Sequence, residues 1–173
     1  MHGTAVGIRA RLIALLCGFS LLLGTPALAK LAPARLSQVT ASAELIVVAN
    51  VAELPTDADG QRFAILNVEG IWHGKAQPTV WLSLGPTGSC DRSSAVRGER
   101  AVFFLNLGAD GLFHIVHAGN GRIPIEGEYA LVPPLVLLPD ESHVRSSDRR
   151  VQLSEFERMV KVNRPGFPGD PIS

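Results

Sequence analysis

The chain has 173 residues, 46% of them hydrophobic, and its 16 basic residues balance its 16 acidic ones. A neutral chain has no electrostatic attraction to nucleic acid or to an anionic membrane, so neither is expected as a partner. The length suits one domain and is short for two well-formed cores.

The first 29 residues have the order of a secretory signal peptide. Arg9 and Arg11 precede a run at 12–23 that is apolar except for Ser20, and Ala27-Leu28-Ala29 supplies a small-residue cleavage site. The run has about 12 residues, whereas a membrane-spanning helix needs about 20. We predict that residues 1–29 are a cleaved signal and that the mature protein begins at Lys30. It is then exported to the periplasm or the medium, with no membrane span left.

One cysteine, Cys90, remains after the predicted cleavage, because Cys17 lies in the signal. No disulfide forms within such a chain, and three interpretations of Cys90 stay open. It is a buried small hydrophobe, a site of intermolecular pairing, or a reactive thiol.

The next segments predict a short helical turn followed by strands. Residues 37–43 suit a helical turn, and residues 44–52 are almost continuously apolar, as in a strand covered on both faces. Residues 63–72 alternate as a second strand, in which Gly70 marks a bend. In a third strand, residues 79–84, Val80, Leu82 and Leu84 share one face.

A long polar connection, residues 85–98, holds Cys90 and leads to a fourth strand at 101–107. Phe103 and Phe104 then point to opposite faces, one into the core and the other toward the terminal helix or a partner. Residues 108–111 have the composition of a hairpin turn into a strand at 112–118, and residues 129–132 suit a further short strand.

Near the C-terminus, Ser154 and Glu157 have the spacing of a capping box, and Phe156, Met159 and Val160 share one helical face. This predicts a closing helix of about ten residues on the sheet, followed by a flexible, proline-rich tail at 163–173. The predicted fold is mainly β: a small OB-like barrel of five to six strands with a C-terminal helix, spanning residues 30–162.

Three segments resemble a known family: residues 43–51, residues 68–75, and Cys90 followed by the strand at 98–105. They are similar to the bacterial exported relatives of the TIMP-like, or netrin-like, OB-fold domain. The resemblance implies a barrel with a flanking helix that binds macromolecules and does no chemistry. Two features of the family are absent from this sequence. In the family's protease inhibitors a cysteine at the mature N-terminus binds the protease's zinc, and no cysteine lies near Lys30. Residues 117–122 also lack the cysteine that would pair with Cys90.

The residues that suggest metal, calcium or phosphate sites do not have the spacing that such sites need. His114 and His117 lie three apart on a predicted strand and face opposite ways, so no metal is expected. Residues 57–60 suggest a calcium loop, but Pro55 and Leu66 occupy its end positions. Residues 119–122 lack the third glycine and the following helix of a phosphate loop, so no cofactor is expected. They predict a tight, exposed connection in which Arg122 is available to a partner.

The leading hypothesis is an exported, noncatalytic module that contacts a protein or an envelope component through the loops at 85–98 and 118–127. The candidate binding residues are Cys90, Asn120 and Arg122. The alternatives are a thiol-dependent enzyme or redox sensor centred on Cys90, with His114 or His117 as base, and a dimer bridged through Cys90. Rapid labelling of Cys90 in the folded state would favour the thiol hypotheses.

Overall fold

The computed structural model describes residues 32–56, 58–85 and 95–163. The chain divides into the units Met1–Lys30 and Leu31–Ser173, and the described residues all belong to the second. The predicted signal, Cys90 and the predicted tail beyond Asn163 lie outside them. Along the chain the elements are β1 (Ala34–Arg35), α2 (Leu36–Ala41), β2 (Leu45–Glu53), β3 (Arg62–His73), β4 (Thr79–Leu84), β5 (Arg100–Leu107), β6 (Phe113–Ile115), the 3-10 turn η1 (His117–Gly119), β7 (Arg122–Glu126), β8 (Tyr129–Val132), β9 (Val136–Leu137), β10 (Arg149–Gln152) and α3 (Leu153–Val162).

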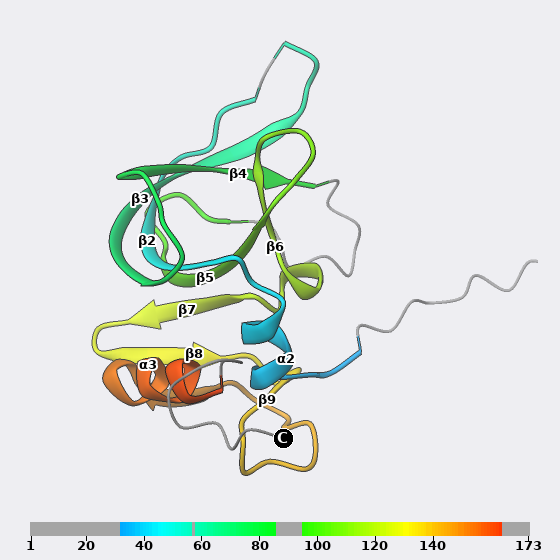
Figure 1. Cartoon of the computed structure of the whole chain (residues 1–173), viewed down its shortest axis with the longest axis vertical. Coiled ribbons are helices and arrows are strands. Elements are labelled where there is room, and N and C mark those ends of the chain that lie inside the picture. Colours follow the sequence, from blue (N-terminus) through cyan, green and yellow to red (C-terminus); the bar gives the residue numbers. More distant parts are fainter. Residues whose placement is uncertain (1–31, 57, 86–94, 164–173) are drawn as a thin grey trace, which may run out of the picture. The chain divides into compact units, whose positions relative to one another are not determined.

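Five strands close into a barrel in the order β2-β3-β4-β6-β5 and back to β2 (Figure 1). Every pair in this ring is antiparallel except β4 with β6. Three further strands, β7, β8 and β10, extend the sheet from β5. The predicted mainly β fold, a small OB-like barrel with a C-terminal helix, is therefore confirmed.

The barrel interior is filled by alternate residues of its strands. β2 contributes Leu45, Val47, Ala49 and Val51, and the other strands add Ala64, Leu66, Val80, Leu82, Leu84, Ala101, Phe103 and Leu105. The period of two places these side chains on one face of each strand. The predicted inward set of Val80, Leu82 and Leu84 is confirmed.

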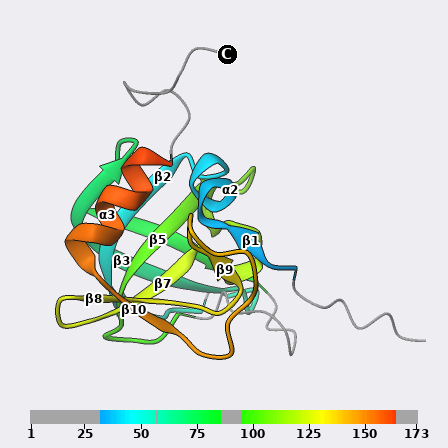
Figure 2. The same cartoon turned by 90° about the horizontal axis from the view of Figure 1, so that it is seen from below.

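A second core lies on the outer side of β2 and β5. Ile46, Val48, Val102 and Phe104 pack there with Phe156 and Val160 of α3 and with residues of α2 and β7. Figure 2 shows α2 and α3 over this side of the barrel. β2 and β5 are thus buried on both faces, which explains their continuous apolar sequences. The predicted opposite orientation of Phe103 and Phe104 and the docking stripe of the terminal helix are confirmed.

Two local predictions are wrong. The helix α3 begins at Leu153 after an N-cap at Gln152, so Ser154 lies inside the helix and caps nothing. Glu157 instead pairs with Lys161, at 2.7 Å. The strand expected at 112–118 is also shorter, because the chain leaves β6 after Ile115 and turns through η1.

In the part of the chain that the structure describes, no helix has the length and apolar character needed to cross a membrane.

Candidate functional site

The segment 118–127, predicted as an exposed connection, is built into the sheet. β7 pairs with β5 on one side and with β8 on the other. A Cβ at Gly121 would lie 2.7 Å from Val116 Cγ2 and 3.0 Å from the carbonyl oxygen of Phe104. The glycine therefore permits close packing, and the prediction of an exposed loop is wrong.

The two candidate binding residues of this segment have structural positions. Asn120 ends η1 with 1% of its surface exposed, and its Oδ1 has no hydrogen-bond partner among the described residues. The Arg122 guanidinium donates to both carboxylate oxygens of Glu99, at 2.7 and 2.8 Å. Glu99 in turn accepts from the Val96 amide at 3.0 Å, so the pair ties β7 to the turn before β5. Asn120 is therefore buried and Arg122 is paired within the protein, and their role in binding stays a prediction.

The two histidines considered as ligands or bases have different neighbours. His114 Nε2 lies 3.1 Å from both carboxylate oxygens of Asp110, and both residues line one hollow on the surface. The hydrogen bond with His114, joined by one from the Leu112 amide, lowers the pKa of Asp110 below its ordinary value. His117 instead contacts Ser42, the residue that follows α2.

The Ser42–His117 pair resembles a nucleophile and its base, and His117 has the left-handed backbone often found at functional sites, with φ 53°. Ser42 Oγ lies 3.0 Å from His117 Nε2 and 2.8 Å from the Gln38 carbonyl oxygen. A hydroxyl that donates its single proton to Gln38 accepts from His117, and one that donates to His117 has the direction that a general base needs. In both tautomers the contact ties His117 to Ser42, the C-cap of α2.

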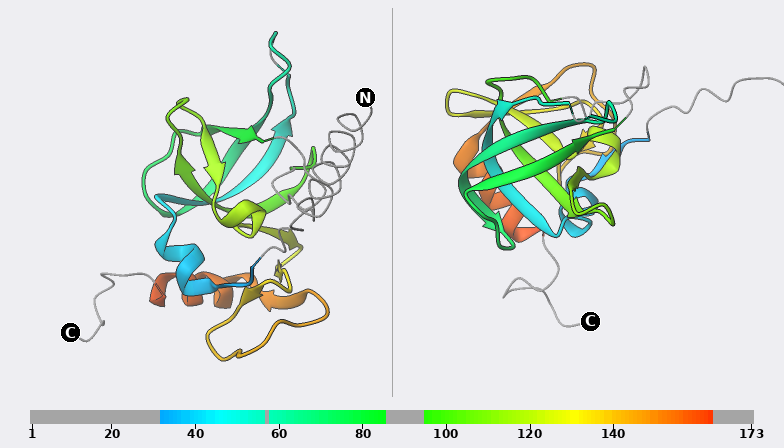
Figure 3. Two further views of the ribbon diagram at one scale, coloured as in Figure 1. Left: turned by 90° about the vertical axis from the view of Figure 1, so that its right-hand side faces the viewer. Right: turned by 90° about the horizontal axis from the view of Figure 1, so that it is seen from above.

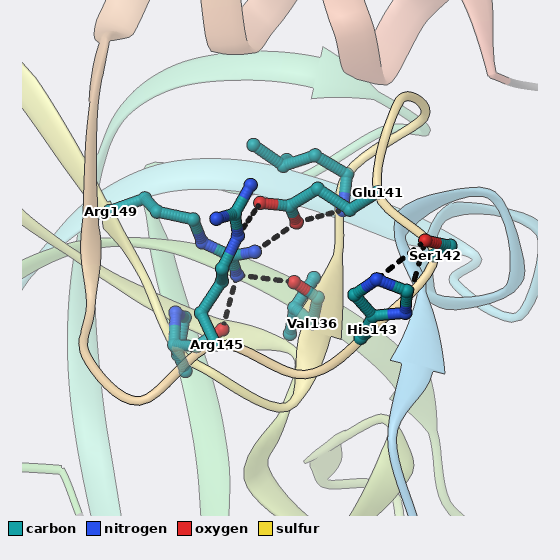
Figure 4. Close-up of polar contacts among 8 residues, drawn as sticks. Val136, Glu141, Ser142, His143, Arg145 and Arg149 are labelled. Atoms are coloured by element: carbon teal, nitrogen blue, oxygen red, sulfur yellow. Dashed lines mark hydrogen bonds and ion pairs between the residues drawn. The ribbon is translucent and has the colours of Figure 1, made fainter.

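A buried ion pair closes the long connection between β9 and β10 (Figure 4). The Glu141 side chain is 5% exposed and accepts from the Arg149 guanidinium, from the Leu138 amide at 2.9 Å and from Arg145 at 3.3 Å. Arg149 also donates to the carbonyls of Pro133, at 2.6 Å, and Val136. Burial on its own would raise the pKa of Glu141, but the hydrogen bonds from Arg149 and Leu138 outweigh it and lower the pKa.

We expect Glu141 to stabilise the protein at neutral pH and to lose this effect in acid. Because its folded pKa lies below the ordinary 4.5, the stabilisation is fully present above about pH 4.5 and is lost as the pH falls through the folded pKa. Urea unfolding of the wild type and of Glu141→Gln should show a stability gap at about pH 7 that narrows toward about pH 3. A gap that stays constant over this range would contradict the assignment.

The outer surface of β3 and β4 is the part of the barrel wall that carries exposed aromatic residues. We call it the β3–β4 face and define it by Phe63, Ile65 and Asn67 of β3 and their cross-strand partners Ser83, Trp81 and Thr79 of β4, of which Ser83 is buried. Trp81 is 48% exposed, and its ring packs on Phe63 with centroids 5.2 Å apart. Figures 1 and 3 show β4 on the side of the barrel away from α3.

Two open hollows lie along β4. One, of about 710 Å³, is lined by 59–62, by 83–85 and by Asp110 and His114. The other, of about 380 Å³, is lined by 75–77, by 79–81 and by 111–113. The hollows therefore adjoin the two ends of β4, with Trp81 lining one and Ser83 the other. The β2–β3 loop lines the larger hollow, residues 75–77 between β3 and β4 line the smaller one, and the β5–β6 turn contributes to both.

Comparison of the sequence with protein-family models and with curated proteins found no match. The resemblance to TIMP-like barrels therefore stays a prediction that rests on the quoted segments. The candidate site is accordingly defined by its geometry alone.

Proposed function

We propose that this protein is an exported, noncatalytic binding module that holds its partner on the β3–β4 face. The observation that carries the proposal is the half-exposed Trp81, supported from one side by Phe63. A rigid aromatic ring that stays in water without a partner is the kind of residue that dominates binding energy once it is covered.

The position of the face also supports a binding role. In OB barrels the second and third strands, with the loops after the first and fourth strands, form the usual ligand surface. Here these are β3 and β4, the loop at 54–61 and the turn at 108–112. The larger hollow lies between that loop and that turn.

The export part of the proposal rests on the signal-like order of residues 1–29, and the noncatalytic part on the absence of a recognisable catalytic motif in the sequence. Cys90 lies outside the described residues, so the thiol hypotheses receive no support from the geometry.

Native mass spectrometry of the protein purified from its exported compartment tests the proposal. We expect a mass that corresponds to residues 30–173 and a stoichiometric companion. Trp81→Ala should weaken retention of the companion by roughly tenfold or more, as for a central aromatic of an interface. Tyr129→Ala is the matched control, because Tyr129 is a 41% exposed aromatic on β8, outside the face.

Equal retention by Trp81→Ala and the wild type would contradict the location of the site. A turnover that disappears when Cys90 is replaced by serine would contradict the noncatalytic assignment.

A further inference from the structure

We propose that the β3–β4 face binds an uncharged polysaccharide chain, with one pyranose ring stacked on Trp81 and neighbouring rings in the two hollows along β4. This inference rests on the proposed function and names the class of its ligand. Four properties of the face lead to it.

The first property is the charge balance. The larger hollow is lined by Arg62 and by the acidic residues Asp59 and Asp110, and the charged residue that lines the smaller hollow is Lys75. Asp110 is moreover hydrogen bonded to His114, at 3.1 Å. A face with compensating charges attracts neither a phosphate polymer nor an anionic bilayer, since both require a cationic surface.

The second property is the hydrogen bonding of β4. This strand is paired with β3 along its whole length, and on its other edge β6 pairs with it at Leu82. A peptide that binds by strand addition needs a continuous free edge of amides and carbonyls, and the contact with β6 interrupts this edge in the middle of β4. Its ligand must therefore be recognised through side chains and loop backbone.

The third property is the mixture of apolar and polar groups around Trp81. Phe63 and Ile65 of β3 and Leu112 and Phe113 of the smaller hollow are apolar, whereas Thr79, Gln77 and Lys75 are polar. The core of a protein–protein interface is depleted in charged residues and dry. A pyranose suits the observed mixture, because its C–H face packs on an indole ring while its hydroxyl groups donate and accept hydrogen bonds around the rim.

The fourth property is the arrangement of the hollows. Both adjoin β4, one at 79–81 and the other at 83–85, and both reach the turn and strand at 110–114. An elongated ligand that passes Trp81 enters both, whereas a single small molecule fills one. Several linked rings therefore explain the geometry better than a monosaccharide.

Isothermal titration calorimetry on the mature protein tests the inference with cellohexaose and chitohexaose, and with dextran sulfate as the charged counterpart. We expect at least one neutral hexasaccharide to bind, and dextran sulfate to bind no better. Trp81→Ala should lower the affinity by roughly tenfold or more, and Tyr129→Ala should leave it unchanged. Acrylamide quenching of tryptophan fluorescence should fall on saturation, because the sugar covers Trp81.

The outcomes separate this inference from the proposed function. If neither hexasaccharide binds but Trp81→Ala loses a protein companion in the mass-spectrometric test, the ligand class is wrong and the binding face stands. If neither binds and Trp81→Ala retains the companion, both are wrong. If a hexasaccharide binds equally to Trp81→Ala and the wild type, the sugar site lies elsewhere and the inference is overturned.

Discussion

Glu141→Ala is expected to lower the free energy of unfolding by about 3–5 kcal/mol, the usual cost of leaving a buried charge without its partner. The carboxylate satisfies Arg149, whose side chain is itself largely buried, and the Leu138 amide. Without it, the Arg149 guanidinium keeps only the carbonyls of Pro133 and Val136. Equilibrium urea unfolding monitored by tryptophan fluorescence measures the loss.

The neighbouring pair supplies the control for this experiment. Arg145 also contacts Glu141, but its side chain is 64% exposed, so Arg145→Met should cost less than about 1 kcal/mol. If Glu141→Ala is too unstable to refold, Glu141→Gln keeps the shape and should still unfold at a lower urea concentration than the wild type. A loss for Glu141→Ala no larger than for Arg145→Met would show that the pair is not a structural clamp.

Strand periodicity was sufficient to predict the barrel. The continuous run at 44–52 indicates a strand buried on both faces, and β2 is buried in this way because one face lines the barrel while the other contacts the second core. Phe103 and Phe104 divide between the two cores for the same reason. The short strands β1, β9 and β10 were not predicted, because their pairing depends on contacts between distant segments and not on local pattern.

The candidate site was harder to find in the sequence, and the signal for it was present. Once Val80, Leu82 and Leu84 are placed inside, the period of two places Thr79, Trp81 and Ser83 on the opposite face of the strand, so an outward Trp81 follows from the sequence. The position of Trp81 relative to Phe63 and the β5–β6 turn depends on the strand register, which the sequence does not show.

For Asn120 and Arg122, by contrast, the sequence predicted exposure that the fold does not have. Their surroundings, Gly119-Asn120-Gly121-Arg122, have the composition of an exposed turn. In the fold, Gly121 permits a contact with Val116 that a larger residue would prevent, and Arg122 is paired with Glu99 of a preceding segment. Turn composition and close packing both favour glycine, so the sequence alone does not distinguish them.

Phe156→Ala is expected to lower the free energy of unfolding by about 3–5 kcal/mol, the range found when a large buried aromatic is truncated. Phe156 is fully buried in the second core, and its ring lies 6.1 Å from that of Trp72, so the change leaves a cavity between α3 and the barrel. Unfolding in urea gives the free energy, and near-ultraviolet circular dichroism reports the loosened packing of Trp72. Val162→Ala is the control on the same helix, because Val162 is 52% exposed and its truncation should cost less than about 0.5 kcal/mol. Phe156→Leu, which retains more of the volume, should fall between the two. If Phe156→Ala and Val162→Ala lower the free energy of unfolding by similar amounts, α3 is not docked through Phe156. The second core would then not include this side chain.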